Sequence, residues 1–284
     1  MRGKRVLITG ATNGIGKAAA LDLAKMGAEV LIVGRDEIKT RKVLRDLMSL
    51  SGNTKLDFLL ADLSSFADVR AIANEFLSRH DRLDVLLNNA GAVFSEFRAS
   101  ADGYEMTFAL NHLSYYLLTL LLLDTLKKTA QEQGEARIVN VSSSAHRNAT
   151  MRLDNLRDPS GYSFMNSYGS SKLMNVLFTY ELARRLQDSA VTVNAVHPGL
   201  VDTGFGHNTG RVWASVIKVL QKLFAISPQK GAETLVYLAS SPDATDISGK
   251  YWNKKQQKRS SEISYDREQQ RQLWEFSAAI TGVE

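Results

Sequence analysis

The sequence predicts an α/β protein in which helices cover both faces of one parallel sheet. Its strand-like runs, such as "RVLITG" (5–10) and "EVLIVG" (29–34), are continuously apolar rather than alternating, which is typical of strands buried on both faces. These runs alternate with helical patterns, as they do in a doubly wound sheet. The 284 residues are 44% hydrophobic and 23% charged, without an internal repeat or a Pro/Gly-rich linker. We therefore expect one domain that spans residues 1–284.

The elements follow one another in a regular order. Strands are expected at 5–10, 29–34, 55–62, 83–91, 136–143 and 191–199, with a short seventh strand near 248–252. Helices are expected at 14–26, 36–50, after Ser65, at 104–128 and at 164–187. Ser65 with Asp68 three residues later resembles a capping box, which marks a helix start. About seven strands with right-handed crossovers give a doubly wound sheet.

Composition and charge exclude several classes of protein. There is no cysteine, so disulfides and thiolate metal sites are ruled out, and the five histidines lack metal-ligand spacing. The net charge of +5 is mild, and we expect the basic run 254–259 to be a solvated loop rather than a nucleic-acid or lipid contact. The apolar run 113–123 is too short to span a bilayer. No leader pattern precedes the first strand, so we expect no secretion signal and a cytoplasmic protein.

A glycine-rich turn follows the first strand. In "TGATNGIG" (9–16), Gly10 allows a sharp turn off the strand, and Gly14 and Gly16 remove side chains where a ligand and a strand approach the backbone. The amides at the start of the next helix then face an anion. A glycine triplet alone is weak evidence, but its place after the first strand of a parallel pattern predicts a dinucleotide phosphate site.

The end of the second strand bears on the choice of cofactor. Gly34 and Arg35 stand where NAD sites usually carry a carboxylate, and a guanidinium can grip a 2′-phosphate with charge-assisted bonds. Asp36 could bind the ribose instead, although we interpret it as the N-cap of the next helix. The sequence therefore favours NADP(H) over NAD(H).

At this point the chain resembles the short-chain dehydrogenase/reductase family along nearly all of its length, and within it the retinol dehydrogenase-like branch. The matching elements, in order, are "TGATNGIG", "ADL" (61–63), "NNAG" (88–91), Asn111, "VNVSS" (139–143), "YGSSK" (168–172) and "HPG" (197–199). The phrases "LNHLSYYLLT", "KLMNVLFTYELARRL" and "LWEFSAAITG" suggest the branch. The resemblance implies a Rossmann-type fold, and the lack of metal-ligand spacing noted above predicts no metal.

The resemblance also implies how the cofactor is bound. Asp62 would bond the adenine amino group, Leu63 would add a backbone contact, and Thr203 would meet the nicotinamide carboxamide. The residues expected to contact the cofactor are Gly10, Thr12, Asn13, Gly14, Ile15, Gly16, Arg35, Asp62, Leu63, Asn89, Ala90, Gly91, Tyr168, Lys172, Pro198, Gly199, Val201 and Thr203.

Four residues are expected to carry the chemistry. Hydride transfer to a carbonyl needs a proton donor, and a phenol with a lowered pKa serves well. Spacing of four on a helix puts Lys172 beside Tyr168, and we expect its ammonium to lower the phenol pKa. Ser143 is expected to hold the substrate oxygen, with Ser142 as its main rival. The resemblance implies that Asn111 kinks the long helix and holds a water that links Lys172 to solvent.

The sequence says less about the substrate and the partners of the protein than about its cofactor. Residues 203–228 contain an apolar amphipathic stretch, which suggests a lipophilic substrate such as a long aldehyde, a retinoid, a steroid or a quinone-like carbonyl. Simple packing on the body explains the stretch equally, and peripheral membrane contact is a further alternative. From the family we expect a homodimer formed by helices 104–128 and 164–187, with no nucleic-acid partner. A reductase of carbon–carbon double bonds and a non-catalytic NADP(H) sensor or scaffold are the alternative functions.

Overall fold

The computed structural model describes residues 1–154, 156–199 and 226–284, and their strands form one sheet. The strands are β1 (Arg5–Thr9), β2 (Glu29–Gly34), β3 (Leu56–Leu60), β4 (Val85–Asn88), β5 (Ala136–Val141), β6 (Val191–His197), β7 (Tyr251–Asn253) and β8 (Gln256–Lys258). Their order in the sheet is β3-β2-β1-β4-β5-β6-β7-β8, and all neighbours are parallel except β7 and β8. The predicted doubly wound parallel sheet is confirmed.

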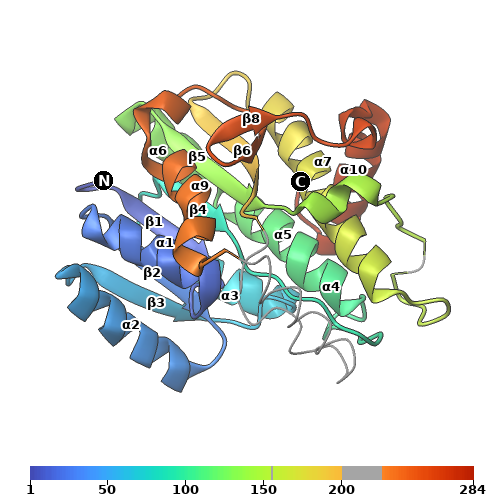
Figure 1. Ribbon diagram of the computed structural model, residues 1–284, viewed down its shortest axis with the longest axis horizontal. Helices are drawn as coiled ribbons and strands as arrows, with labels where there is room; N and C mark the ends of the chain where they lie inside the picture. Colours follow the sequence, from blue (N-terminus) through green and yellow to red (C-terminus); the bar gives the residue numbers. More distant parts are fainter. Residues whose placement is uncertain (155, 200–225) are drawn as a thin grey trace.

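Helices cover both faces of this sheet (Figure 1). The larger helices are α1 (Gly14–Lys25), α2 (Glu37–Ser51), α3 (Phe66–Arg79), α5 (Ser114–Leu121), α6 (Leu123–Gln133), α7 (Phe164–Arg185), α9 (Pro228–Ser240) and α10 (Arg267–Thr281). α1, α2 and α9 pack on one face against Val6, Ile8 and Ile32. The other helices pack on the opposite face against Leu7, Leu31 and neighbours. Alternate strand residues therefore feed two separate cores.

The long helix expected at 104–128 is interrupted. Residues Met106–Phe108 form α4, Ala109–Leu113 form the π-helical turn η1, and α5 then ends at Leu121. The helix to Leu121 and α6 meet at an angle of 55°. Helical periodicity alone could not show this, because a π turn inserts one residue without changing the apolar composition. Among the described residues no single helix is long and apolar enough to cross a membrane, and only this bent pair passes that test.

The basic run 254–259 is not the loop that we expected. Lys254 and Lys255 have φ of 53° and 59°, which is the geometry of a two-residue hairpin turn. Gln256–Lys258 then pairs antiparallel with β7, with all three side chains exposed. The expectation of solvent exposure was correct, whereas the expectation of a loop was wrong. A strand without apolar side chains leaves no hydrophobic period to detect.

Three smaller 3₁₀ turns complete the described chain: η2 (Ser144–Asn148), η3 (Pro242–Ala244) and η4 (Glu262–Tyr265). The helix starts expected at Asp36 and Ser65 are confirmed, because Asp36 accepts a bond from Lys39 N and Ser65 from Asp68 N. These caps fix where the polypeptide leaves β2 and β3, close to the edge where the strands end.

The C-terminal helix α10 closes the core on one side. Its Trp274 is 5% exposed and packs against Tyr116 and Phe178, with ring centroids 5.2 Å and 5.9 Å away. The Arg185 guanidinium lies over the indole at 4.1 Å. These contacts tie α10 to α5 and α7, which Figure 1 shows side by side.

Replacing Trp274 with alanine should therefore lower the free energy of unfolding by roughly 3 to 5 kcal/mol, because it leaves a cavity in an aromatic cluster. Urea unfolding followed by far-UV circular dichroism measures this. The control is Leu50→Ala, since Leu50 is 60% exposed at the end of α2 and its loss should change little. Equal effects of the two substitutions would contradict the packing described here.

Candidate active site

The glycine turn after β1 is closely packed against the end of β4. Gly10 has φ of 65°, and a Cβ on it would lie 2.7 Å from the Ala90 Cα. A Cβ on Gly16 would lie 2.5 Å from both the Asn89 Nδ2 and the Gly10 carbonyl oxygen. Side chains at these positions would push the turn away from the sheet. The two glycines are thus required by the fold as well as by any ligand.

Asn89 braces the same turn. Its Nδ2 donates to the carbonyls of Thr9 and Gly10 at 2.9 Å and 3.2 Å, and the amides of Asn89 and Ala90 both donate to the Thr9 hydroxyl. The Asn89 side chain therefore faces the turn. The predicted contact of Asn89 with the cofactor is therefore expected from its backbone.

The start of α1 fits a bound anion. Asn13, at its N-cap position, makes no side-chain hydrogen bond to the first amides of α1, whereas Asp36 caps α2 in the usual way. Gly14 has φ of 51°, which turns the backbone into the helix without a side chain in the way. Uncapped amides at the positive end of a 12-residue helix suit a dinucleotide phosphate. Thr12 and Ile15 flank the turn at the same end.

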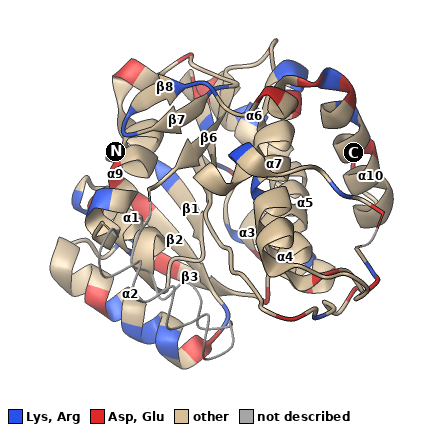
Figure 2. Ribbon diagram, turned by 45° about the vertical axis from the view of Figure 1, so that its right-hand side comes forward, with Lys and Arg blue, Asp and Glu red and all other residues tan. Residues whose placement is uncertain are grey.

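The end of β2 carries the predicted Arg35. Its side chain is 78% exposed, and its Nη1 lies 3.7 Å from Asp62 Oδ2 at the end of β3. Asp62 also accepts bonds from the amide and hydroxyl of Ser64, while Leu63 is buried. Figure 2 shows both basic and acidic positions along the ribbon of the neighbouring α2. The structure therefore brings Arg35 and Asp62 together at one edge.

Gly34 has a packing role that the sequence did not indicate. A Cβ there would overlap the Thr40 hydroxyl and would lie 2.7 Å from Thr12 Cγ2. The space at Gly34 is thus filled by these two threonine side chains. Thr40 is held in this position because its hydroxyl donates to the Asp36 carbonyl.

Ser143 and Tyr168 meet beyond the end of β5. Tyr168 lies on α7, and its hydroxyl is hydrogen-bonded to that of Ser143. The Ser143 hydroxyl also accepts a bond from the Ala145 amide at 3.2 Å, which starts η2. The Ser142 hydroxyl points elsewhere and donates to the Lys172 carbonyl at 2.7 Å. This geometry favours Ser143 over Ser142 as the partner of Tyr168.

Lys172 is buried beside this pair. It is 3% exposed, and its Nζ donates to the Val141 carbonyl at 3.1 Å. The same Nζ lies 5.9 Å from the ring centre of Tyr168 and 5.7 Å from that of Tyr115. Burial lowers the pKa of Lys172 to about 7. The amine therefore gains and loses its proton near neutral pH.

The phenol pKa differs from our expectation. Burial raises the pKa of Tyr168 to about 12, and the hydrogen bond with Ser143 only partly opposes this rise. We expected the Lys172 ammonium to lower the pKa of Tyr168, and this expectation was wrong for the chain by itself. Desolvation outweighs attraction here, because it acts on Lys172 too and disfavours the charge that was to stabilise the phenolate.

Asn111 lies in the middle of the π turn η1. Its Nδ2 donates to the Ala92 carbonyl and the Ser171 hydroxyl, each at 3.0 Å, and its Oδ1 accepts from the Ala92 amide at 2.9 Å. A Cβ on Gly91 would lie 3.1 Å from Asn111 Oδ1 and 3.3 Å from Lys172 Nζ. Asn111 thus joins the end of β4 to α7 next to the lysine.

The turn after β6 is only partly described. Gly199 has φ of 95°, and a Cβ on it would lie 2.8 Å from Ile226 Cδ1. Pro198 precedes it and is half-buried. Val201 and Thr203 lie outside the described residues, as does most of the segment 203–228.

Two site residues were missed by sequence reasoning. His146 Nδ1 donates to the Ser143 carbonyl at 2.6 Å while its Nε2 accepts from the Ser261 amide at 3.1 Å, so it holds the turn at Ser143 to the C-terminal region. Tyr115 is buried beside Lys172, and its hydroxyl has no hydrogen-bond partner within the described part of the chain. In the sequence, only the closeness of His146 to Ser143 and of Tyr115 to Asn111 could have indicated these two residues.

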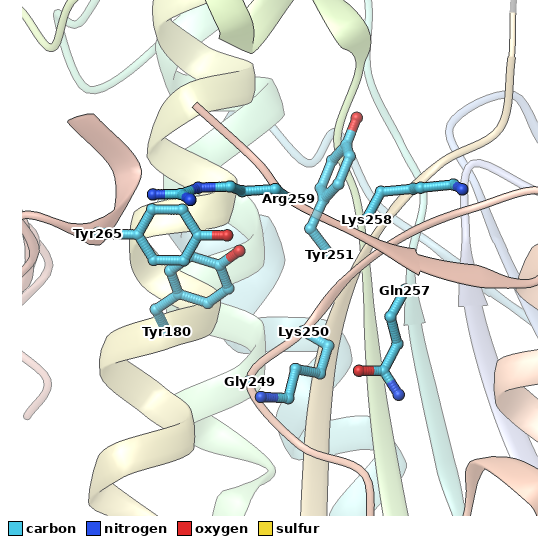
Figure 3. A pocket seen from close by; sticks show the side chains of 8 residues that line it. All are labelled: Tyr180, Gly249, Lys250, Tyr251, Gln257, Lys258, Arg259 and Tyr265. Atoms are coloured by element: carbon cyan, nitrogen blue, oxygen red, sulfur yellow. The ribbon is translucent and has the colours of Figure 1, made fainter. Parts of the chain in front are cut away.

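A separate pocket of about 280 Å³ lies between α7, β7 and β8 (Figure 3). Tyr180, Lys258 and Tyr265 are among its lining residues, and Tyr168 is not. In the ranges that the structure describes, no three His, Cys, Asp or Glu residues are grouped as metal ligands. Neither feature adds to the site at the ends of β4 and β5.

The buried lysine makes stability depend on pH. Unfolded, Lys172 holds its proton up to its ordinary pKa of 10.5, while folded it loses it near 7. The unfolded chain binds more protons between these values, so stability rises with pH there. We expect a gain of about 2 kcal/mol from pH 7 to pH 9, and its loss in Lys172→Met. Urea unfolding at each pH tests this; a variant with the wild-type pH dependence would contradict it.

Comparison with known proteins agrees with this geometry. The family model for short chain dehydrogenases matches residues 4–211. Human retinol dehydrogenase 13 is 38% identical over 287 residues, covering 99% of this chain and 86% of that protein. Human polyprenol dehydrogenase is 38% identical over 281 residues, covering 98% of this chain and 84% of that protein.

Two solved structures of similar fold contain nicotinamide cofactors. The Pseudomonas aeruginosa RhlG/NADP complex has a TM-score of 0.71 and 27% identity, covering 88% of this chain and 94% of that one. The 3-ketoacyl-(acyl-carrier-protein) reductase of Brucella melitensis, complexed with NADH, has a TM-score of 0.68 and 27% identity, covering 88% of this chain and 96% of that one. The chain thus belongs to the short-chain dehydrogenase/reductase family of oxidoreductases, in its retinol dehydrogenase-like branch.

Proposed function

We propose that the protein is an NADP(H)-dependent oxidoreductase that interconverts a carbonyl and an alcohol on a lipophilic substrate. One observation carries the proposal: the bonded hydroxyls of Tyr168 and Ser143 stand beside the buried Lys172, beyond the end of β5. The glycine turn after β1 ends at the same edge of the sheet, where doubly wound folds bind their ligands.

The roles follow from the groups present. NADP(H), when bound, would supply or accept the hydride. Tyr168 donates a proton to the substrate oxygen or removes one from it, and the Ser143 hydroxyl holds that oxygen by a hydrogen bond. The raised phenol pKa keeps Tyr168 protonated at neutral pH, which suits a proton donor in carbonyl reduction.

Lys172 supplies protons to Tyr168 in this scheme. Its pKa of about 7 lets it exchange a proton at working pH. Only one of its three N–H groups is needed for the Val141 carbonyl, so others are available for cofactor ribose hydroxyls. Asn111, which the π turn places next to it, is the proposed relay toward solvent.

The preference for NADP(H) rests on Arg35. Asp36 is occupied as the N-cap of α2, so the exposed guanidinium is the better-placed group for a ribose phosphate. One of the similar structures contains NADP and the other contains NADH, so the preference between the two cofactors is argued from Arg35 and Asp36 alone. Thr203 and Val201 are proposed to contact the nicotinamide end.

The proposed substrate class rests on the relatives. Retinol and polyprenol, after which two of them are named, are both isoprenoid alcohols with a long apolar chain. We propose an alcohol or aldehyde of this kind, covered by the segment 203–228. The homodimer and the cytoplasmic location with peripheral membrane contact stay predictions from the sequence.

Tyr168→Phe should lower turnover by about 10²-fold to 10⁴-fold, because it removes the only proposed proton donor to the substrate oxygen. NADPH oxidation with retinal and long-chain aldehydes, followed by absorbance, measures this. NADPH affinity, measured by fluorescence, should stay within about threefold, since the phenol is not a phosphate ligand.

The matched control is Tyr180→Phe, about three turns further along α7, where the hydroxyl bonds Ser260. It should keep nearly full turnover. Retained activity in Tyr168→Phe would refute the mechanism, and products reduced at a carbon–carbon double bond would refute the proposed reaction.

Arg35→Ala should raise the KM for NADPH about tenfold or more, because one charge-assisted contact to the 2′-phosphate is lost. The KM for NADH should change little. Steady-state kinetics with both cofactors check this, with Arg45→Ala, an exposed position further along α2, as the control. Equal changes for both cofactors would show that Arg35 does not read the phosphate.

A further inference from the structure

We infer that His112 is a positioning residue that fixes the hydrogen bonding of the catalytic lysine and links it to the C-terminal helix α10. The inference rests on the proposed role of Lys172. It comes from a chain of buried hydrogen bonds that starts at Ser277 on α10 and ends at the Val141 carbonyl.

The first link is between α10 and the π turn. His112 is wholly buried, and its Nε2 lies 3.1 Å from the Ser277 hydroxyl. Its Nδ1 lies 3.3 Å from the Asn175 Oδ1 on α7. Burial lowers the pKa of His112 to about 4, so the ring is neutral at physiological pH and has one donor and one acceptor.

The second link fixes which nitrogen carries the proton. Asn175 Nδ2 donates to the carbonyls of Asn111 at 2.9 Å and Val141 at 3.2 Å. The Asn175 Oδ1 must therefore accept, so the His112 Nδ1 donates and its Nε2 accepts from Ser277. Ser277, His112 and Asn175 thus each have one orientation that satisfies all of these hydrogen bonds. Turning any of the three groups around would place two acceptors or two donors face to face.

The third link reaches the lysine. The Val141 carbonyl accepts from both Asn175 Nδ2 and Lys172 Nζ, the latter at 3.1 Å. The two donors share one oxygen, so the amide weakens the bond that the ammonium can make. Because a hydrogen bond to the ammonium favours the charged form, Asn175 helps to keep the lysine pKa low. His112 maintains this by holding the amide in place.

The π turn makes the arrangement possible. Asn111 and His112 are consecutive, yet Asn111 faces Ala92 and Ser171 while His112 faces Asn175 and Ser277. Two consecutive residues thus bond Ser171 and Asn175, which lie on either side of Lys172 in α7. Turns of this kind are frequent at functional sites.

The pH dependence of stability tests the inference without any turnover. In His112→Phe, which keeps a ring but loses both bonds, the Asn175 amide is free to turn, and Lys172 no longer shares the Val141 carbonyl with it. The pH at which the stability begins to rise, near 7 in the unchanged protein, should then increase by about half a pH unit or more. Ser277→Ala should move it in the same direction by a smaller amount, and His112→Gln should restore it in part.

Each variant is compared with the same variant carrying Lys172→Met, so that the difference reports the lysine alone. Other groups facing Lys172 do not titrate between pH 7 and 9, because burial raises the pKa of Tyr168 to about 12 and that of Tyr115 well above its ordinary value of 10, while the pKa of His112 is about 4.

The matched control is Phe76→Leu, a core substitution in α3 that should lower stability equally at every pH. If His112→Phe and Ser277→Ala behave like this control, His112 only fills space and the inference is wrong. An enzyme that turns over no carbonyl would refute the proposed function instead, and it would leave this stability result unchanged.

Discussion

The site depends on the burial of Lys172 against the end of β5. A lysine that is 3% exposed loses much of its hydration, and its pKa falls to about 7. Below neutral pH the buried ammonium destabilises the fold, because among the described residues it has only one carbonyl acceptor, that of Val141. A group buried at such cost and surrounded by other polar side chains is typical of a functional position.

Three consecutive residues of β5 and its end hold α7 in register with this lysine. The Val141 carbonyl accepts from Lys172 Nζ, the Ser142 hydroxyl donates to the Lys172 carbonyl, and the Ser143 hydroxyl bonds Tyr168. Successive strand side chains point to opposite sides, so the same strand end can grip the helix backbone and present a hydroxyl to the substrate. The rival serines of the sequence thus have complementary tasks rather than competing ones.

Sequence patterns predicted the sheet and the main helices because buried parallel strands are recorded as unbroken apolar runs. They also placed Ser143 and Tyr168 correctly at one edge. Helical periodicity could not show the π turn at Asn111, because it does not distinguish such a turn from an ordinary one, and only the family resemblance indicated an irregular helix there. The charge state of Lys172 was misjudged for a different reason, because spacing shows which groups meet but not how deeply they are buried.

The C-terminal helix changes what α5 and α7 can do. Residues 169–182 of α7 are buried all around the helix, by the sheet on one side and in part by α10 on another. Two copies pairing through this middle section would find little surface left to bury, so a dimer through these helices would need their ends or a displaced α10. Trp274 and Ser277 of α10 cover part of this surface. Ser277 also bonds His112 in the π turn, and His112 is connected to Lys172 through the hydrogen bonds described above. The helices from which the sequence predicted a dimer are here packed against α10, and the C-terminal segment becomes part of the proposed catalytic framework.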